Sequence, residues 1–398
     1  MDAEIRNVLL YVDDAVRDDA LGEGLAALGP TYKTVAASTH TPTSFGSLLT
    51  GLYPPESGIL SFEHTVPGRT TSIFDLETHD VSLAAEGGMN HSLAAVFDDP
   101  PRASIEDVTE PFVHVVRRPG GHAPYDGFDW DSYEYQDETA VEYLHRISGD
   151  PSRARDDYAR GVERSFEEFE SVLSHLEERD LLKETLVVYT SDHGELLGEY
   201  GFFGHTHLAT PEVVYVPTTF IHPTLEPGRR DQLLHHVDIL PTLAASIEAD
   251  VDFGVMRGRP FGGDRKQGYN HFEHVHYGDI PDSLEDIVQR TETFDRTIRS
   301  LWDVDGGRVF VEGSLVPAAL VYLVLLTKSP IGRQLIHNRG FTGLFKRFIP
   351  GRQSYGSPSF DHRDARKRIE NLLKNRTGPV RRELDAETKD RLHDMGYI

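Results

Sequence analysis

The 398-residue chain has no cysteine, only eight lysines and no apolar run long enough to cross a bilayer. Without cysteine, it can form neither a disulfide nor a thiolate metal site. Its longest apolar run, residues 315–326, contains Pro317 and is shorter than the roughly 20 residues of a membrane-spanning helix. The first expected strand begins at Asn7, which leaves no room for a signal peptide. These absences predict a soluble, cytoplasmic protein.

Acidic residues outnumber basic residues in the chain, 65 to 40. The formal net charge is −25, and the bases are 32 arginines and eight lysines. This composition is typical of proteins from salt-loving organisms, whose acidic surfaces stay hydrated in concentrated salt; an ordinary acidic enzyme is the alternative. Residues 328–382 differ, with 14 basic against three acidic side chains and a net charge of +11.

The basic segment has two candidate roles. Apolar and basic residues interleave in residues 340–352, which would suit peripheral docking on an anionic lipid or glycan surface. Alternatively, the arginines hold the segment against the acidic catalytic domain. In molar salt the Debye length falls to roughly 3 Å, so close ion pairs persist better than long-range attraction to a membrane. We expect the second role.

Short apolar runs alternate with helical patterns. Asn7–Val12, Phe112–Val116 and Leu186–Thr190 are rich in β-branched residues and are predicted to be buried strands. Apolar residues recur at helical spacing in Val162–Leu176, directly before the third run. This alternation predicts an α/β protein, a three-layer sandwich with a mostly parallel central sheet and helices on both faces.

Chemically active side chains follow each of these strands. Asp13–Asp14 ends the first, Asp192–His193 follows the third, and His122 lies shortly after the second. Ligands of open α/β sheets bind outside the carboxyl ends of the strands. Adjacent carboxylates repel each other unless a cation lies between them. The three strand ends together predict a metal-binding or proton-transfer site.

A fourth segment, Thr39–Gly51, places a hydroxyl at a helix start. Thr41 is predicted to be the N-cap, with Pro42 in the first helical position and Gly51 as the stop. Unpaired backbone N–H groups and the positive end of the helix dipole favour a bound anion there. A capping role alone is the alternative. The accompanying carboxylates and histidine favour a reactive Thr41.

At this point the chain resembles the sulfatase-like branch of the alkaline phosphatase superfamily. The matching segments, in family order and over nearly the whole chain, are Leu9–Asp14, Thr41–Gly58, His122–Tyr125, Ser191–Glu195 with Gly204–His205, Val216–Pro217, His236–Leu243 and Leu384–Ile398. The resemblance implies a smaller C-terminal subdomain with an antiparallel sheet. We expect a catalytic core over residues 1–267 and a subdomain over 268–398, with a hairpin in Arg296–Gly313, the basic segment 328–382 and a terminal helix.

The resemblance also implies a metal site and a nucleophile. The implied ligands of one divalent metal ion are Asp13, Asp14, Asp192 and His193. An imidazole ligand favours manganese or zinc over calcium. Thr41 stands at the nucleophile position, where sulfatases carry a cysteine or serine that is oxidised to formylglycine. Phe45 replaces the arginine that sulfatases carry four residues on, so Thr41 looks like the nucleophile of the family's phosphodiesterases and phosphoglycerol-type transferases.

The remaining site residues follow from this alignment. The expected catalytic residues are Thr41, His122 and His205, and the expected substrate contacts are Arg118, Arg17 and His207. One of the two catalytic histidines would protonate the leaving alcohol, and Arg118 would hold a non-bridging oxygen. The alternatives are an ion pair with Asp18 or Asp19 for Arg17 and an exposed loop position for His207.

Three functions are consistent with these residues. The first is hydrolysis or transfer of phosphate mono- or diesters through a covalent Thr41 intermediate. The second is hydrolysis of sulfate esters on glycans or lipids without formylglycine. The third is a non-catalytic relative that binds anionic glycans or lipids. The expected partner is an anionic ester (a glycan, a lipid headgroup or a small molecule) and not nucleic acid.

A second histidine cluster lies outside these positions. It consists of His271, Glu273, His274 and His276. The cluster could be another metal site, but its period-two spacing is also typical of one face of an exposed strand. We prefer the strand interpretation, because these residues lie outside the family's ligand positions.

Overall fold

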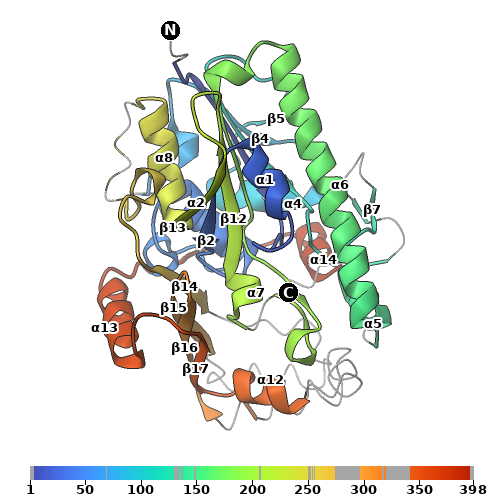
Figure 1. Ribbon diagram of the computed structural model, residues 1–398, viewed down its shortest axis with the longest axis vertical. Helices are drawn as coiled ribbons and strands as arrows, with labels where there is room; N and C mark the ends of the chain where they lie inside the picture. The colour runs from blue at the N-terminus through green and yellow to red at the C-terminus, as the bar shows by residue number, and fades with distance from the viewer. Residues whose placement is uncertain are drawn as a thin grey trace.

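The computed structural model describes residues 4–394 apart from 69, 130–133, 136–137, 148, 206–207, 250–251, 253, 255, 274–295, 316–317 and 320–340. An eight-stranded sheet in the order β13-β2-β12-β9-β1-β6-β4-β5 forms its centre (Figure 1). These strands are β1 (Asn7–Asp13), β2 (Pro30–Val35), β4 (Asp80–Ala84), β5 (Arg102–Ala103), β6 (Phe112–Arg118), β9 (Thr185–Thr190), β12 (Tyr215–Ile221) and β13 (Gly228–His235). Strand β12 runs antiparallel to both neighbours and the other pairs are parallel, which confirms the predicted mostly parallel sheet.

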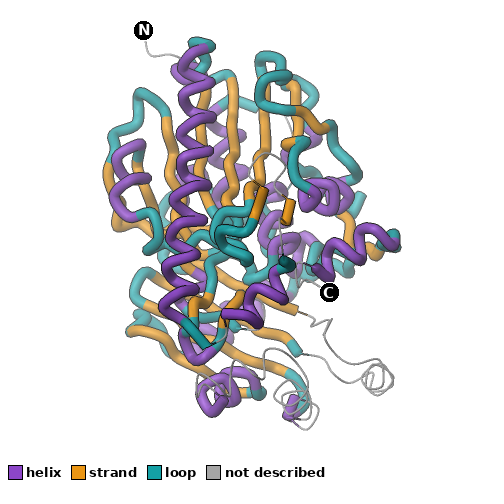
Figure 2. Tube along the Cα trace, turned by 90° about the vertical axis from the view of Figure 1, so that its right-hand side faces the viewer, coloured by secondary structure: helices purple, strands orange, loops and turns teal. Residues whose placement is uncertain are grey.

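Helices cover both faces of this sheet, as predicted. On one face, α2 (Thr41–Thr50), α4 (Gly88–Ala94) and α8 (Ile239–Ser246) pack against the even-numbered residues of β1. On the other face, α1 (Gly22–Leu28) and the long α6 (Pro151–Glu178) pack against its odd-numbered residues. Figure 2 shows α6 running along the length of the sheet. Period-two alternation in a strand buried on both faces therefore decides which face each side chain reaches.

A smaller antiparallel sheet adjoins the carboxyl ends of the central strands (Figure 1). It contains β14 (Gly268–Glu273), β15 (Thr297–Asp303), β16 (Gly306–Glu312) and β17 (Gly351–Gly356) in sequential order. The β15–β16 hairpin pairs Asp303 with Gly306, in agreement with the turn predicted from the glycines. Helices α12 (Phe341–Phe348) and α13 (His362–Leu373) flank this sheet. The predicted second, antiparallel sheet is thereby confirmed.

The end of the chain returns to the central layers. Strand β18 (Val380–Arg381) pairs with β3 (His64–Thr65), and α14 (Ala386–Asp394) packs near α4. Leu384 and Leu392 belong to the same apolar cluster as α2 and α8. Residues 380–394 thus pack with the first part of the chain, and the division at 267/268 stays a prediction.

Short elements complete the description. They are α3 (Pro54–Ser57), α5 (Ala140–Ile147), α7 (Pro211–Val214), β7 (Phe128–Asp129), β8 (Glu134–Tyr135), β10 (Leu196–Leu197), β11 (Phe203–Gly204), and the 3₁₀ helices η1 (Ile73–Asp75), η2 (Ala95–Phe97), η3 (Leu182–Glu184), η4 (Glu199–Gly201), η5 (His236–Asp238) and η6 (Pro260–Gly262). Among the described residues, no helix combines the length and apolarity needed to cross a membrane.

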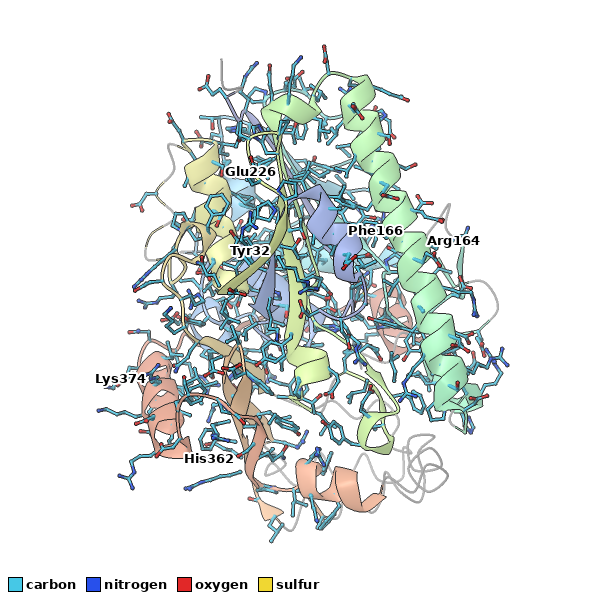
Figure 3. The ribbon with its side chains drawn as sticks, viewed as in Figure 1. Tyr32, Arg164, Phe166, Glu226, His362 and Lys374 are labelled. Carbon is cyan, nitrogen blue, oxygen red and sulfur yellow. The ribbon has the colours of Figure 1, made fainter. Side chains whose placement is uncertain are left out.

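The described part of the basic segment contacts the rest of the protein mainly through arginines. Arg376 pairs with Glu273, and Arg366 lies 3.3 Å from Glu312. Arg382 donates to the Phe62 carbonyl at 2.9 Å. Lys374, at the end of α13, instead points into solvent (Figure 3). Glu273 and Glu312 belong to the smaller sheet, so of these three contacts only that of Arg382 reaches the predicted catalytic core. Both the attachment role and peripheral docking through residues 340–352 stay predictions.

Candidate active site

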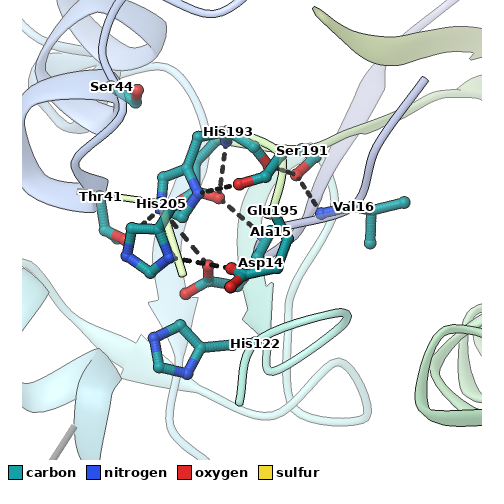
Figure 4. Close-up of polar contacts among 12 residues, drawn as sticks. Asp14, Ala15, Val16, Thr41, Ser44, His122, Ser191, His193, Glu195 and His205 are labelled. Atoms are coloured by element: carbon teal, nitrogen blue, oxygen red, sulfur yellow. Dashed lines mark hydrogen bonds and ion pairs between the residues drawn. The ribbon is translucent and has the colours of Figure 1, made fainter. Parts of the chain in front are cut away.

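A buried cluster of potential ligands lies where β1 and β9 end, beside the start of α2 (Figure 4). One ligand atom from each of Asp14, Asp192 and His193 lies within 4.8 Å of the others. All three side chains are fully buried. Residues 178 positions apart in sequence meet here because β1 and β9 are parallel neighbours and their carboxyl ends share one edge of the sheet.

The ring of His193 has a fixed orientation. Its Nδ1 lies 3.0 Å from the Gly194 carbonyl oxygen, which can only accept, so Nδ1 carries the proton. The Nε2 lone pair then faces the cluster, 3.6 Å from Asp14 Oδ1 and 3.5 Å from Asp192 Oδ2. A backbone carbonyl that fixes the tautomer in this way is a common second partner of a metal-binding histidine.

Thr41 directs its hydroxyl into the same cluster. Its Oγ1 lies 3.2 Å from His193 Nε2, and the residue is fully buried. The predicted N-cap is wrong by one residue: α2 begins at Thr41, and His40 precedes it in extended conformation. The Thr41 hydroxyl is therefore engaged at the cluster and does not cap the helix. Gly51 ends α2 in left-handed conformation, as expected.

The structure does not bring Asp13 into this cluster. Asp13 lies at an odd position of β1 and faces α6, where it accepts hydrogen bonds from Ser165 at 2.6 Å and Tyr189 at 2.8 Å. Burial is the main cause that raises its pKa to about 7. The predicted ligand pair is thus divided by the strand's alternation, and Asp14 alone turns toward His193.

The same alternation separates the two arginines of β6. Arg117 is buried and forms an ion pair with Asp14. Burial would raise the pKa of Asp14, but the Arg117 guanidinium, followed by His122 and His193, holds it below its usual value. Arg118 instead lies 3.6 Å from Glu86 and lines a cavity of about 580 Å³ beside α6. The structure therefore places Arg117, not the predicted Arg118, beside the candidate site.

Two further histidines complete the cluster. The His205 ring stacks on that of His193 with centroids 4.0 Å apart, and His122 lies 5.3 Å from His205. Glu195 Oε2 is hydrogen-bonded to His205 Nδ1 at 2.9 Å. Burial, and then the Asp14 charge, raise the pKa of Glu195 well above its usual range. The structure thus gathers both histidines predicted as proton donors (Figure 4).

The other predicted contacts fall elsewhere. Arg17 forms ion pairs with Asp19 at 2.8 Å and Glu199 at 2.9 Å, so the ion-pair alternative describes its position. His207, His274 and His276 lie outside the described residues. His271 lies on a strand as expected, but β14 is buried there and not exposed. His271 bonds to Glu273 at 3.0 Å and to the Tyr269 hydroxyl at 2.7 Å, the contacts of a structural histidine.

The donor set fits a divalent cation. Among the described residues, the buried Asp192 Oδ2 accepts no hydrogen bond of good geometry, although the Thr41 hydroxyl interacts with this carboxylate. Burial is the main cause that raises the pKa of Asp192 to about 6, and the Asp14 charge adds to it. Two buried carboxylates beside one guanidinium leave negative charge that a cation would neutralise. Two carboxylates and one imidazole suit a transition metal better than calcium.

Sequence reasoning assigned no role to Arg117 or Glu195. The Arg117–Arg118 dipeptide does indicate an arginine beside Asp14, because adjacent residues of a strand point to opposite faces of the sheet. The sequence does not indicate which of the two arginines lies on the face of Asp14. Glu195 lies two residues after His193 within a motif already recognised, yet its bond to His205 joins two strands of a small hairpin and required the structure.

Comparisons with known proteins identify a family and a relative that this chain resembles. Residues 86–248 match the family model described as Sulfatase. The low-salt glycan biosynthesis sulfotransferase Agl7 of Haloferax volcanii is 29% identical over 419 residues, covering 98% of this chain and 96% of that protein.

Solved structures share the fold at low identity. The phosphonate monoester hydrolase of Agrobacterium radiobacter is 12% identical with a TM-score of 0.62, covering 95% of this chain and all of that one. A 2-O GAG sulfatase is 13% identical with a TM-score of 0.57, covering 78% and 83%. The chain is thus similar to the Sulfatase family over residues 86–248, to a glycan biosynthesis sulfotransferase over nearly its whole length, and to these solved enzymes in its α/β fold.

Proposed function

We propose that the protein is a metal-dependent transferase or hydrolase of anionic esters that works through a covalent intermediate on Thr41, with glycan sulfate esters as the first candidate substrates. The observation that carries the proposal is the Thr41 hydroxyl, 3.2 Å from His193 Nε2 within a buried Asp14–Asp192–His193 cluster. A binding protein has no need of a hydroxyl directed at its metal ligands.

Asp14, Asp192 and His193 would hold the metal ion. When bound, it would act as a Lewis acid that stabilises negative charge on the transferred group and on the threonine oxygen. Arg117 lowers the pKa of Asp14 and adds a guanidinium in contact with this cluster. The N-terminus of α2 directs backbone N–H groups toward the same region.

The residues then support two half-reactions. Thr41 Oγ1 forms a bond to the sulfur or phosphorus, and the bond from that atom to the bridging ester oxygen breaks. The leaving alcohol takes a proton from His205 or His122, and the hydroxyl proton of Thr41 passes to solvent. In the second half, an acceptor alcohol or water attacks the same atom and gives its proton to the histidine. The bond from that atom to Thr41 Oγ1 breaks, and the threonine oxygen takes a proton from solvent to restore the hydroxyl.

Glu195 supports His205 in this scheme. Its hydrogen bond occupies His205 Nδ1, so Nε2 is the His205 nitrogen that would meet the leaving oxygen. The stacked position of His205 on His193 keeps that nitrogen near the proposed metal ligands. Glu195 therefore acts as a positioning residue, because it contacts the histidine and not the ester.

Sulfate and phosphate esters have separate support. The relative named as a glycan biosynthesis sulfotransferase aligns with nearly the whole chain and favours sulfuryl transfer. Phe45, at the position of the sulfatase arginine, and the fold shared with a phosphonate monoester hydrolase favour the phosphate ester that sequence reasoning ranked first. Both transferred groups are tetrahedral anions that fit the same donors.

The test is turnover of p-nitrophenyl sulfate, p-nitrophenyl phosphate and bis-p-nitrophenyl phosphate with manganese, zinc or calcium in high-salt buffer, each with and without an acceptor sugar. Thr41→Val removes the hydroxyl at constant shape, and Thr43→Val on the same helix is the matched control. We expect Thr41→Val to abolish turnover and mass spectrometry to locate the trapped group on Thr41. Full activity of Thr41→Val would refute the nucleophile, and metal binding without any turnover would favour the binding-protein alternative.

A further inference from the structure

The histidine and carboxylate that flank the candidate site lie at the base of one small hairpin. Strands β10 and β11 pair Leu196 with Gly204, so Glu195 and His205 emerge side by side at its open end. Their hydrogen bond of 2.9 Å closes that end. The geometry of His205 therefore depends on the conformation of residues 195–205, which we call the histidine hairpin.

The tip of the histidine hairpin has an unfavourable backbone. Tyr200, within η4, has φ of 59° and ψ of 13°, a left-handed conformation that a bulky side chain rarely adopts. Such a conformation persists only where surrounding contacts hold it in place. On one side the tip is held by Glu199, which pairs with Arg17 at 2.9 Å and accepts from the Leu197 N–H at 2.6 Å.

The other side of the tip is held from the C-terminal part of the chain. The guanidinium of Arg347, on α12, lies over the Tyr200 ring with its central carbon 3.7 Å from the ring centroid. Arg347 Nε donates to the Tyr355 hydroxyl at 3.0 Å. Tyr355 in turn donates to Gln353 at 3.0 Å, and the Gln353 amide donates to the Arg347 carbonyl at 2.9 Å. Residues of β17 thus fix the arginine in the stacked position.

We propose that Arg347 is a positioning residue that holds the histidine hairpin closed, so that the smaller sheet controls the alignment of His205 with the candidate site. This inference rests on the proposed function for its effect on turnover, but not for its effect on the hairpin. A planar guanidinium stacked on an aromatic ring is a short-range contact, which concentrated salt screens less than a distant charge pair.

The experiment combines Arg347→Ala, Tyr200→Gly and the double variant in the full chain. Tyr200→Gly removes the ring while glycine tolerates the left-handed backbone, so it separates the loss of stacking from strain. Arg352→Ala is the control, since Arg352 is an exposed arginine on β17. The readouts are hydrogen exchange of the amides of residues 196–204, metal content, and kcat and KM for the best ester.

We expect Arg347→Ala to speed exchange in the histidine hairpin by about tenfold and to lower kcat by about tenfold, with KM and metal content unchanged. The double variant should be no worse than the stronger single variant, because the two side chains form one contact. Arg347→Lys should keep only part of the protection from exchange. It retains the positive charge over the Tyr200 ring, but an ammonium does not stack as a planar guanidinium does. Arg352→Ala should match the wild type.

Unchanged exchange in Arg347→Ala would overturn the inference whatever the activity, as would additive effects of the two single changes. If Arg347→Ala fails to fold, Arg347→Lys and Tyr200→Phe replace it, and Tyr200→Phe should keep protection because the ring remains. If the wild type turns over no ester, the proposed function fails, while the exchange data still decide whether Arg347 holds the hairpin.

Discussion

At the end of β1, adjacent residues of the same type have different surroundings, because they lie on opposite faces of the central sheet. On the α2 face, Asp14 and Arg117 meet beside His193 and Thr41. On the α6 face, Asp13 bonds to hydroxyls of the protein interior and Arg118 pairs with Glu86 beside a cavity. One position along a strand thus separates a candidate catalytic carboxylate from a structural one. The residue types alone do not distinguish them.

The largest expected effect compares the two aspartates directly. Asp14→Asn and Asp13→Asn make the same chemical change on opposite faces. We expect Asp14→Asn to lose metal binding and about 10³-fold or more in kcat/KM, because a ligand and an electrostatic contact disappear together. Asp13→Asn should retain the metal and lose mainly stability, about 1–3 kcal/mol, since its two hydroxyl partners must reorient around an amide. Metal analysis, turnover and denaturant unfolding measure these effects.

If Asp13→Asn lost more metal and more activity than Asp14→Asn, the assignment of the candidate metal site to the α2 face would be wrong. Equal loss of metal in both variants would restore the sequence prediction that Asp13 is also a ligand. A third variant, Asp192→Asn, provides the positive control, because Asp192 belongs to the same cluster as Asp14.

The two arginines give the next comparison. Arg117→Ala leaves the buried Asp14 carboxylate without its ion pair, and breaking such a pair costs about 3–5 kcal/mol. We expect a clear drop in thermal stability and about a 10²-fold loss in kcat/KM. Arg118→Ala should change kcat/KM by less than about threefold, because its partner Glu86 is partly exposed and such pairs contribute little. Steady-state kinetics and calorimetry on both variants would show whether Arg118 binds substrate after all.

A smaller effect is expected at the support of His205. Glu195→Gln keeps the shape of the side chain but weakens the bond to His205 Nδ1, and changes to such second partners cost about 10–100-fold in activity. Tyr125→Phe is the matched comparison, since the Tyr125 hydroxyl contacts the other Glu195 oxygen at 3.3 Å. It should cost only a few-fold. An equal loss in both variants, measured as kcat, would show that general packing and not the histidine contact is responsible.

The smallest expected effect lies wholly on the α6 face. Ser165→Ala removes one of the two hydroxyls that bond to Asp13. We expect a loss of about 1–3 kcal/mol in the free energy of unfolding, with kcat within about twofold of the wild type. Chemical denaturation and turnover measured on the same preparation provide the check. A large loss of kcat would place Asp13 in the reaction and remove the contrast between the two faces.

The strands that carry the site could be predicted from the sequence, because each is a short and mostly apolar run. Asn7–Val12 and Leu186–Thr190 are the two runs, and both form strands buried along their length. The order of the family motifs also indicated that Asp192, His193 and Thr41 belong together, and the structure brings them within a few ångströms. The start of α2 was misplaced by one residue, because threonine's capping preference competes with its bond to His193.

Other features depended on contacts between distant segments. The bond between Glu195 and His205 follows from the pairing of two-residue strands, which carry no periodic signal of their own. The packing of Arg347 on Tyr200 joins residues 147 positions apart, and no local pattern indicates it. The return of Leu384 and Leu392 to the central core likewise reflects the path of the chain.

The sequence by itself determined the α/β class and the identity of the donors at the strand ends, because hydrophobic periodicity and residue chemistry are local properties. Only the tertiary structure decided which of two adjacent carboxylates joins His193, and which of two adjacent arginines pairs with that carboxylate. The physical reason is the two-residue period of a strand, which makes the face of each side chain depend on register and on the layers packed above and below.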